Sequence, residues 1–277
     1  MSRIILGERL QKVLARAGIG SRREIEMWIR AGRIHINRQI ATLGDRVNPQ
    51  DDIRIDGRKL RTNVLEIPAR QILCYYKPVG EVCTRRDPEG RPTIFDKLPR
   101  PRQGRWINIG RLDFNTAGLL LLTTDGELAH RLMHPSYVIE REYAVRILGT
   151  VDEAMLARLK TGVMLEDGEA HFLNIFDAGG DGANHWYHVT VTEGRKHEVR
   201  RLWESQGVTV SRLLRIRYGP VILPKGLHMG KFVDLSPADE NALLNAVGLY
   251  QPPPISKPTP NLPKRTVPYN KFKRGVK

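Results

Sequence analysis

The sequence has few cysteines and no long apolar run. Only Cys74 and Cys83 are present among 277 residues, too few for a disulfide framework, and their spacing does not fit a CxxC zinc or redox pair. No stretch approaches the length of a membrane span, and residues 1–14 carry charges throughout, unlike a signal peptide. These absences favour a soluble protein of the reducing cytoplasm.

Acidic residues are also in short supply. The chain has 45 Lys and Arg against 30 Asp and Glu, which gives a formal net charge of +15. Such an excess favours a polyanionic partner, with nucleic acid first and an acidic membrane surface second. A basic protein whose charge serves only solubility is the alternative.

Residues 8–65 have the pattern of a small separate domain with two helices followed by short strands. Four apolar residues at helical spacing form one face of the first helix: Leu10, Val13, Leu14 and Ala17. Ser21 and Glu24 have the spacing of a capping box and begin the second helix. Apolar and polar residues then alternate around 34–36 and 53–55, which predicts strands.

Arginines concentrate on this segment. Four of them are candidate RNA-binding residues because guanidinium groups grip phosphates bidentately, although any single one could be an ordinary solvated charge: Arg22, Arg23, Arg30 and Arg33. The stretch "LQKVLARAGIGSRREIEMWIRAGRIHINRQ" resembles the S4 RNA-binding module. The resemblance implies docking on structured RNA through shape and phosphate contacts.

A second domain is expected over residues 66–250, after a join near residue 66 that breaks both periodicities. Strands are predicted at 72–76, 106–109, 119–123, 143–148, 186–191 and 213–219, and helices at 127–133, 153–161 and 196–206. Many strands joined by short turns, such as "GGDG" at 179–182, favour a mixed, mainly antiparallel sheet with flanking helices. The fold class predicted for the whole chain is therefore α+β.

The stretch "GRLDFNTAGLLLLTTDGE", residues 110–127, places Asp113 on a loop between two predicted strands. Loops held by a rigid scaffold often display functional groups, which favours a chemical role for this carboxylate. The alternative is that Asp113 caps a turn by accepting a bond from a nearby backbone N–H.

Residues just beyond this loop have patterns typical of structural roles. Thr124 and Glu127 have the spacing of a capping box, so Asp125 is interpreted as a turn residue rather than a second catalytic acid. His130 and His134 are four residues apart, but no third ligand is spaced to join them. No metal site is predicted.

Four motifs occur in an order that resembles the RsuA-type pseudouridine synthases. They are "KPVG" at 77–80, "GRLDFNTAGLLLLTTDGELAHRLMHPS" at 110–136, "EREYAV" at 140–145 and "TEGRKHEVRRLWESQGVTVSRLLRIRYG" at 192–219. An S4 module ahead of this domain is the usual arrangement of that family. The resemblance implies an isomerase that converts uridine to pseudouridine in RNA with no metal or redox cofactor.

The resemblance also implies roles for particular residues. Asp113 matches the essential aspartate, the nucleophile or base, and Tyr143 matches the tyrosine that stacks beneath the target base near its C5 position. Arg200 matches the basic residue that pairs with the aspartate. Arg111, Arg195 and Lys196 are expected on the RNA-binding surface, each with an ordinary solvated charge as the alternative.

Within the family, "CTRRDPEGRPTIFDKLP" and "RLMHPSYVIEREYAV" are most similar to the group that acts on large-subunit (23S) ribosomal RNA. The similarity implies a uridine-2605 type target in the peptidyl-transferase-centre region, met in a pre-ribosomal or protein-free RNA segment by a monomeric enzyme. A sister enzyme with another ribosomal RNA site is one alternative. A non-catalytic S4-type RNA-binding or ribosome-assembly protein is another, although a pure binder has no need of a carboxylate among phosphates.

The last segment, residues 251–277, differs from the rest in composition. Prolines recur every few residues, no apolar period survives, and the segment has basic residues but no acidic ones. This composition is typical of a disordered basic tail. Added, salt-sensitive RNA affinity is one expected role and an inert solubilising extension is the other.

Overall fold

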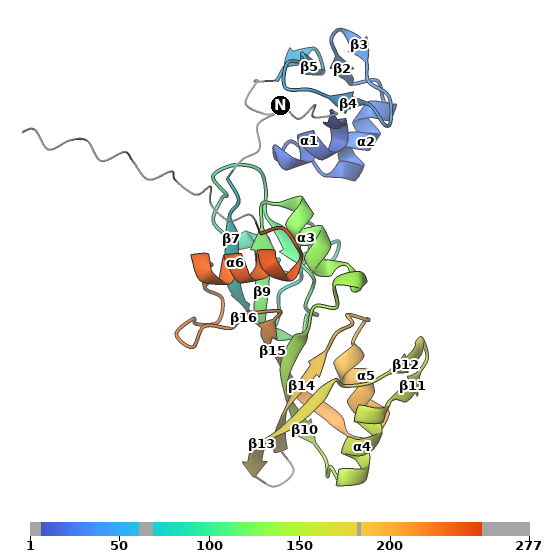
Figure 1. Ribbon diagram of the computed structural model, residues 1–277, viewed down its shortest axis with the longest axis vertical. Coiled ribbons are helices and arrows are strands. Elements are labelled where there is room, and N and C mark those ends of the chain that lie inside the picture. The colour runs from blue at the N-terminus through green and yellow to red at the C-terminus, as the bar shows by residue number, and fades with distance from the viewer. Residues whose placement is uncertain (1–6, 61–68, 182–183, 251–277) are drawn as a thin grey trace, which may run out of the picture.

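The computed structural model describes residues 7–60, 69–181 and 184–250. The join predicted near residue 66 and the tail at 251–277 lie outside the described residues. Figure 1 shows a small N-terminal module, in blue, beside a larger sheet with helices packed against it. The predicted α+β class is confirmed.

The N-terminal module contains two helices, α1 (Leu10–Arg16) and α2 (Arg22–Arg30). Its strands are β1 (Glu8–Arg9), β2 (Ile34–Ile36), β3 (Gln39–Ile40), β4 (Arg46–Val47), β5 (Ile53–Ile55) and β6 (Arg58–Lys59). Strands β3, β2, β5 and β6 form one antiparallel sheet, and β1 pairs with β4. The helix pair and the sheet bury a shared apolar core that includes Leu10, Leu14, Ile25 and Ile34.

Local sequence signals explain the boundaries in this module. The Ser21 hydroxyl accepts a bond from the Glu24 amide at 3.1 Å, and the Glu24 carboxylate accepts one from the Ser21 amide at 3.1 Å, so the predicted capping box is confirmed. The turn between β2 and β3 has Asn37 and Arg38 at φ 49° and 72°. Two successive left-handed residues are the signature of a type I′ turn, which matches the twist of a tight hairpin.

The central domain is built on a sheet of nine strands among the described residues. Its main path runs β13, β14, β10, β15, β9, β7 and β17, while β16 pairs with β15 and β8 with β9. The strands are β7 (Ile72–Lys77), β8 (Ile107–Ile109), β9 (Ala117–Thr123), β10 (Arg141–Leu148), β13 (Asn174–Asp181), β14 (Asn184–Val191), β15 (Thr209–Tyr218), β16 (Val221–Ile222) and β17 (Phe232–Asp234). A separate hairpin joins β11 (Val163–Leu165) and β12 (Gly168–Ala170).

Four α-helices flank this sheet: α3 (Gly126–Met133), α4 (Glu153–Thr161), α5 (Glu198–Glu204) and α6 (Pro237–Ala246). Two short 3₁₀ helices, η2 (Ile94–Asp96) and η3 (Pro135–Tyr137), lie in the connections. None of the helices in the described part of the chain has the length and apolarity needed to cross a membrane. The six strands and three helices predicted for this domain are all present, with boundaries shifted by a few residues.

One strand pair in the central sheet is parallel and joins its two halves. Strands β9 and β15 run side by side in the same direction, with Gly118 opposite Arg215. The backbones approach so closely there that a Cβ on Gly118 would lie 2.3 Å from the Arg215 carbonyl oxygen, and the glycine has φ +111°. Only glycine fits this position. The glycine of "AGLLLL" therefore permits the close pairing that joins the two halves of the sheet.

Different cores support the two halves. Helices α4 and α5 cover one face of β10, β14 and β13, where Leu159, Phe172 and Trp203 are buried. In the other half, β7 and β9 are covered on both faces, by separate clusters that include Leu121 on one side and Leu120 on the other. Tyr143 packs against clusters of both halves, so it lies at their junction.

Two predicted turn features differ in the structure. Gly179 and Gly180 of the "GGDG" stretch are paired residues of β13, which extends to Asp181. The prediction missed this strand because adjacent glycines are more typical of turns. The N-cap of α3 is Asp125, not Thr124.

The Asp125 carboxylate accepts bonds from the amides of Glu127 at 2.8 Å and Leu128 at 3.2 Å. The Thr124 hydroxyl is used elsewhere, since it accepts a bond from the Gln71 amide at 3.1 Å. Thr124 therefore pairs with Gln71 just beyond the end of β9, and the helix begins one residue later than the capping-box spacing predicts.

Candidate active site

A large cavity lies at the junction of the two halves of the central sheet. Its volume is about 1080 Å³, and it is lined by the loop after β8, the start of β10, the segment from the end of β14 into α5, part of β15, and the region around η3. Asp113, Tyr143, Arg111, Arg195 and Lys196 all line it. The cavity thus brings together five residues that are up to 85 positions apart in the sequence.

Asp113 lies on the loop that connects β8 to β9. Its backbone carbonyl accepts a bond from the Thr116 amide at 3.1 Å, which closes a turn. Its side chain remains 43% exposed, and one carboxylate oxygen lies 3.4 Å from Nε2 of His197. The backbone of Asp113 is therefore constrained while its carboxylate faces the cavity, as a reacting group requires.

Lys77 binds the backbone of this loop. It is fully buried on β7, and its ammonium group donates to the carbonyls of Asp113 at 3.0 Å, Thr116 at 2.9 Å and Pro78 at 2.9 Å. Burial lowers the pKa of Lys77. The three carbonyls compensate for burial of the charge, so the lysine of "KPVG" fixes both ends of the Asp113 turn.

Tyr143 lines the same cavity from near the start of β10. It is half-buried and pairs in register with Arg215 of β15 on one side and Val189 of β14 on the other. Packing against two apolar clusters restricts its ring, which leaves a flat aromatic surface with a hydroxyl tip at the cavity wall.

Arg200 does not line the cavity. One guanidinium nitrogen donates to the Val210 carbonyl at 2.9 Å and another to the Asn115 carbonyl at 3.0 Å. No ion pair joins Arg200 to Asp113 within 4.0 Å; the partner of Asp113 among the described residues is His197. The pairing implied by the family resemblance is thus replaced here by an indirect contact, in which Arg200 supports the backbone two residues after Asp113.

The basic residues at the cavity differ in whether their charged groups are already bound to other protein groups. Arg111 and Lys196 are exposed at its rim. Arg195 is held in place, since it pairs with Glu193 at 2.5 Å and donates to the carbonyls of Gly168 at 3.2 Å and Glu169 at 2.8 Å. Arg195 therefore ties the β11–β12 hairpin to the cavity wall, and less of its guanidinium is available to a phosphate.

The four arginines proposed for the S4 module also divide into two kinds. Arg22, Arg23 and Arg30 are exposed on α2. Arg33 makes a bidentate pair with Asp56, at 2.8 and 2.5 Å, and its guanidinium lies 5.1 Å from the centre of the Trp28 ring. The first three can adapt to a phosphate, whereas Arg33 would have to leave a partner.

Sequence reasoning missed the two buried charged residues of the cavity wall, Arg215 and Glu198. Arg215 is 2% exposed. Glu198 is also buried, and burial, with the nearby Glu193 carboxylate adding to it, raises the pKa of Glu198. Both lie inside motifs that were identified, but no local pattern distinguishes a cavity-facing charge from its solvated neighbours.

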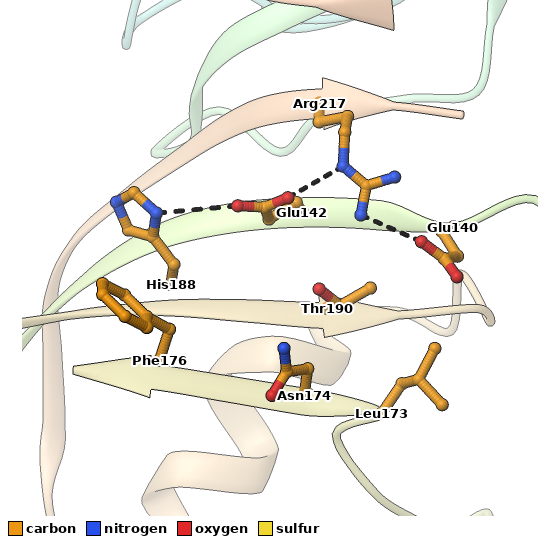
Figure 2. Close-up of a pocket in the computed structure, with 8 residues that line it drawn as sticks. All are labelled: Glu140, Glu142, Leu173, Asn174, Phe176, His188, Thr190 and Arg217. Atoms are coloured by element: carbon orange, nitrogen blue, oxygen red, sulfur yellow. Dashed lines mark hydrogen bonds and ion pairs between the residues drawn. The ribbon is translucent and has the colours of Figure 1, made fainter. Parts of the chain in front are cut away.

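A second, smaller concavity of about 380 Å³ lies on the opposite face of β10, β14 and β13. Figure 2 shows Glu142 between His188 and Arg217, with Arg217 also reaching Glu140. Phe176, which lines it, is 63% exposed. No group of three or more His, Cys, Asp and Glu residues suited to a metal ion occurs here or elsewhere within residues 7–60, 69–181 and 184–250.

Comparison with known proteins agrees with this architecture. A family model described as RNA pseudouridylate synthase matches residues 71–205, and an S4 domain model matches residues 8–53. A crystal structure described as that of a pseudouridylate synthase superposes with a TM-score of 0.60 at 28% identity, covering 85% of this chain and 99% of the other. The chain belongs to the pseudouridine synthase family, as a member with an N-terminal S4 domain.

Its relatives include proteins named ribosomal large subunit pseudouridine synthase B. The one from Salmonella typhimurium is 56% identical over 274 residues, which are 98% of this chain and 94% of that protein. The one from Escherichia coli K12 has the same identity and coverage. The one from Pseudomonas aeruginosa is 60% identical over 245 residues, which are 88% of this chain and 64% of that longer protein.

Proposed function

We propose that this chain isomerises a uridine of large-subunit ribosomal RNA to pseudouridine, with Asp113 as the nucleophile or base. The observation that carries the proposal is the Asp113 carboxylate, held at the junction of the sheet halves in a cavity of about 1080 Å³. Lys77 donates a hydrogen bond to the Asp113 backbone carbonyl, and 43% of the Asp113 side chain is exposed. The names of the relatives support the choice of RNA.

The reaction moves the link between base and ribose from N1 to C5 of uracil. The N1–C1′ bond breaks, the freed base turns, and a C5–C1′ bond forms; C5 then loses its proton and N1 gains one. A carboxylate can form or stabilise the intermediate species at C1′ and then leave, without an added electron carrier. Attack on the uracil ring instead of the ribose remains the second route for Asp113.

Other cavity residues have supporting roles in this proposal. The Tyr143 ring stacks beneath the target base, which must leave its RNA stack to enter the cavity. Arg111 and Lys196, exposed at the rim, bind the flanking phosphates. Arg200 acts as a positioning residue through the Asn115 carbonyl.

The S4 module, in this proposal, contributes affinity for structured 23S RNA through Arg22, Arg23 and Arg30 on α2. These side chains are exposed on one helix, where they can meet successive phosphates of a folded RNA. The finer assignment, a uridine-2605 type target in the peptidyl-transferase-centre region, rests on similarity to the B-type relatives. A cytoplasmic monomer that uses no metal or redox cofactor completes the proposal.

The test is to map pseudouridines in ribosomal RNA of cells that lack this protein, by carbodiimide modification and reverse transcription. One stop in large-subunit RNA is expected to disappear. A plasmid copy of the wild type, or of the Glu166→Gln control with its exposed carboxylate outside the cavity, should restore it. Asp113→Asn should not restore it, although it conserves the shape of the side chain.

Three results would contradict the proposal. A lost stop in small-subunit RNA would indicate a sister specificity. Restoration by Asp113→Asn would show that this carboxylate does not carry the chemistry, and an unchanged pseudouridine map in the deletion strain would favour an S4-type binding protein.

A further inference from the structure

Arg215 lies at the floor of the active-site cavity, between the two halves of the sheet. It pairs in register with Tyr143 of β10 and with Gly118 of β9. It lines the same cavity as Asp113, yet only 2% of it is exposed. A Cβ on Gly110 would lie 3.9 Å from Nη1 of Arg215, so the guanidinium lies close to the start of the Asp113 loop.

The guanidinium is held firmly but is not satisfied. Its Nε donates to the Leu119 carbonyl at 2.7 Å, and its carbon lies 5.1 Å from the centre of the Tyr218 ring. Its Nη2 is buried and has no hydrogen-bond partner within the described residues. A guanidinium stays protonated in a protein, and a buried donor without a partner is costly, so this Nη2 favours binding an oxygen acceptor that enters the cavity.

Arg217, two residues further along the same strand, has partners for its guanidinium donors. It pairs with Glu142 at 2.8 Å and Glu140 at 2.9 Å and donates to the Gly219 carbonyl at 3.1 Å (Figure 2). An irregularity in the β10–β15 register sets Arg217 opposite Glu142 and Arg215 opposite Tyr143. Consecutive residues of β10 point to opposite faces, so the two arginines do as well.

We propose that Arg215 is a catalytic residue that donates to a carbonyl oxygen of the target uracil and stabilises the negative charge on the base during isomerisation. This inference rests on the proposed function. When the N1–C1′ bond breaks, its electron pair stays with the base and spreads over N1, O2 and O4. If Asp113 instead adds to the ring, the displaced electron pair moves toward O4. Arg215 gives up no proton in either route.

The site suits this role because its donors are in place before the charge develops. A buried cation interacts with a developing anion far more strongly than the same cation in solvent. Holding Nε on the Leu119 carbonyl and stacking the guanidinium against Tyr218 prevent reorganisation during the reaction. Nη1 and Nη2 are then the atoms left to meet the uracil.

The experiment compares two RNA substrates under single-turnover conditions with excess enzyme. Protein-free large-subunit RNA is transcribed with uridine or with 5-fluorouridine, and consumption of the target nucleoside is followed after nuclease digestion. Fluorine withdraws electrons from the ring, so an anionic base needs less help from the protein. We expect Arg215→Met to slow the reaction by about 10²- to 10³-fold on uridine, the size seen when one charge-stabilising donor is removed. The deficit relative to wild type should be at least about tenfold smaller on 5-fluorouridine.

The controls separate chemistry from folding. Arg217→Met removes an arginine from the same strand but on the opposite face, and it should stay within about threefold of the wild type on both substrates. Thermal denaturation accompanies each variant. If Arg215→Met fails to fold, Arg215→Lys keeps a charge without the guanidinium fork and should show a smaller loss with the same relief by fluorine.

Three results are decisive. Equal deficits on the two substrates would show that Arg215 supports only the structure or Asp113, and a wild-type rate for Arg215→Met would show no role in chemistry; either overturns this inference alone. A wild type no more active than Asp113→Asn on the uridine transcript would overturn the proposed function and this inference with it.

Discussion

The arginines of the S4 module and those of the central domain are used differently. On α2, Arg22, Arg23 and Arg30 are exposed and have no ion-pair partner among the residues that the structure describes. In the central domain, Arg200 and Arg215 are anchored to backbone carbonyls. Exposed, unpaired cations can adjust to a phosphate backbone whose shape varies, whereas cations bound to carbonyls maintain the geometry of a reacting site. Net charge alone does not distinguish the two uses.

Among the changes to buried or carbonyl-bound cations of the central domain, Lys77→Met should have the largest effect on stability and activity. The change leaves three buried carbonyls without their donor and releases both ends of the Asp113 turn. We expect about 3 kcal/mol lower free energy of unfolding and a loss of activity of about 10²-fold or more, measured by urea denaturation and single-turnover assay. The matched control, Lys225→Met on an exposed lysine, should change stability by less than about 0.5 kcal/mol. Equal stabilities for the two variants would contradict the anchoring role.

Arg200→Met tests whether an anchored cation outside the cavity acts through the loop. Losing the bond to the Asn115 carbonyl should lower kcat by about 10- to 100-fold, while the Kd for RNA changes by less than about threefold. Arg201→Met is the control, because Arg201 pairs with Asp167 and does not reach the Asp113 loop. A changed Kd with an unchanged kcat would make Arg200 an RNA-binding residue instead.

The exposed arginines of α2 should affect affinity rather than rate. Replacing Arg22, Arg23 and Arg30 together by Gln should weaken RNA binding and reduce the slope of log affinity against log salt by about 2 to 3, since each phosphate contact contributes about 0.7 to 0.9. Arg33→Gln should change the slope by less than about 1, because Asp56 already engages that guanidinium. If the triple variant kept the wild-type slope, the S4 module would not use this face for RNA.

Glu198→Gln should have the smallest effect, seen in the pH dependence of stability. Burial raises the pKa of Glu198 above its ordinary value of 4.5, so the folded state holds this proton to higher pH than the unfolded state does. Stability contributed by this group is therefore lost as pH rises from 4.5 through the raised pKa. The variant should lose less stability over that range in urea denaturation. Glu166→Gln, at an exposed carboxylate, should match the wild type.

Local signals in the sequence explain much of the fold. Helical spacing, the Ser21–Glu24 capping box and the turn at Asn37–Arg38 each depend on residues close in the chain, and the structure contains all three. Helix α6 was missed although its start carries a clear signal. Ser236 caps it by accepting from the Asp239 amide at 3.1 Å, and Pro237 follows the cap. Its weak apolar periodicity hid that signal.

For the candidate site, the sequence predicted which residues gather there better than it predicted their contacts. Asp113, Tyr143 and Arg111 were named from motif resemblance, and the structure places all three at one cavity; their roles remain predictions. The support for Asp113 differs from what the resemblance implied, because Arg200 binds carbonyls instead of the carboxylate. Such partners depend on loop geometry, which residue spacing does not specify.

The sequence by itself determined the fold class, most elements and the motifs, because propensity, capping and periodicity act over a few residues. Only the tertiary structure decided which charges enter the cavity. Strict alternation along β15 would put Arg215 and Arg217 on the same face. The irregular register against β10 separates them, so one is buried beside Tyr143 and the other pairs with Glu142. A bulge is a property of two strands together, and it exists only once they have paired.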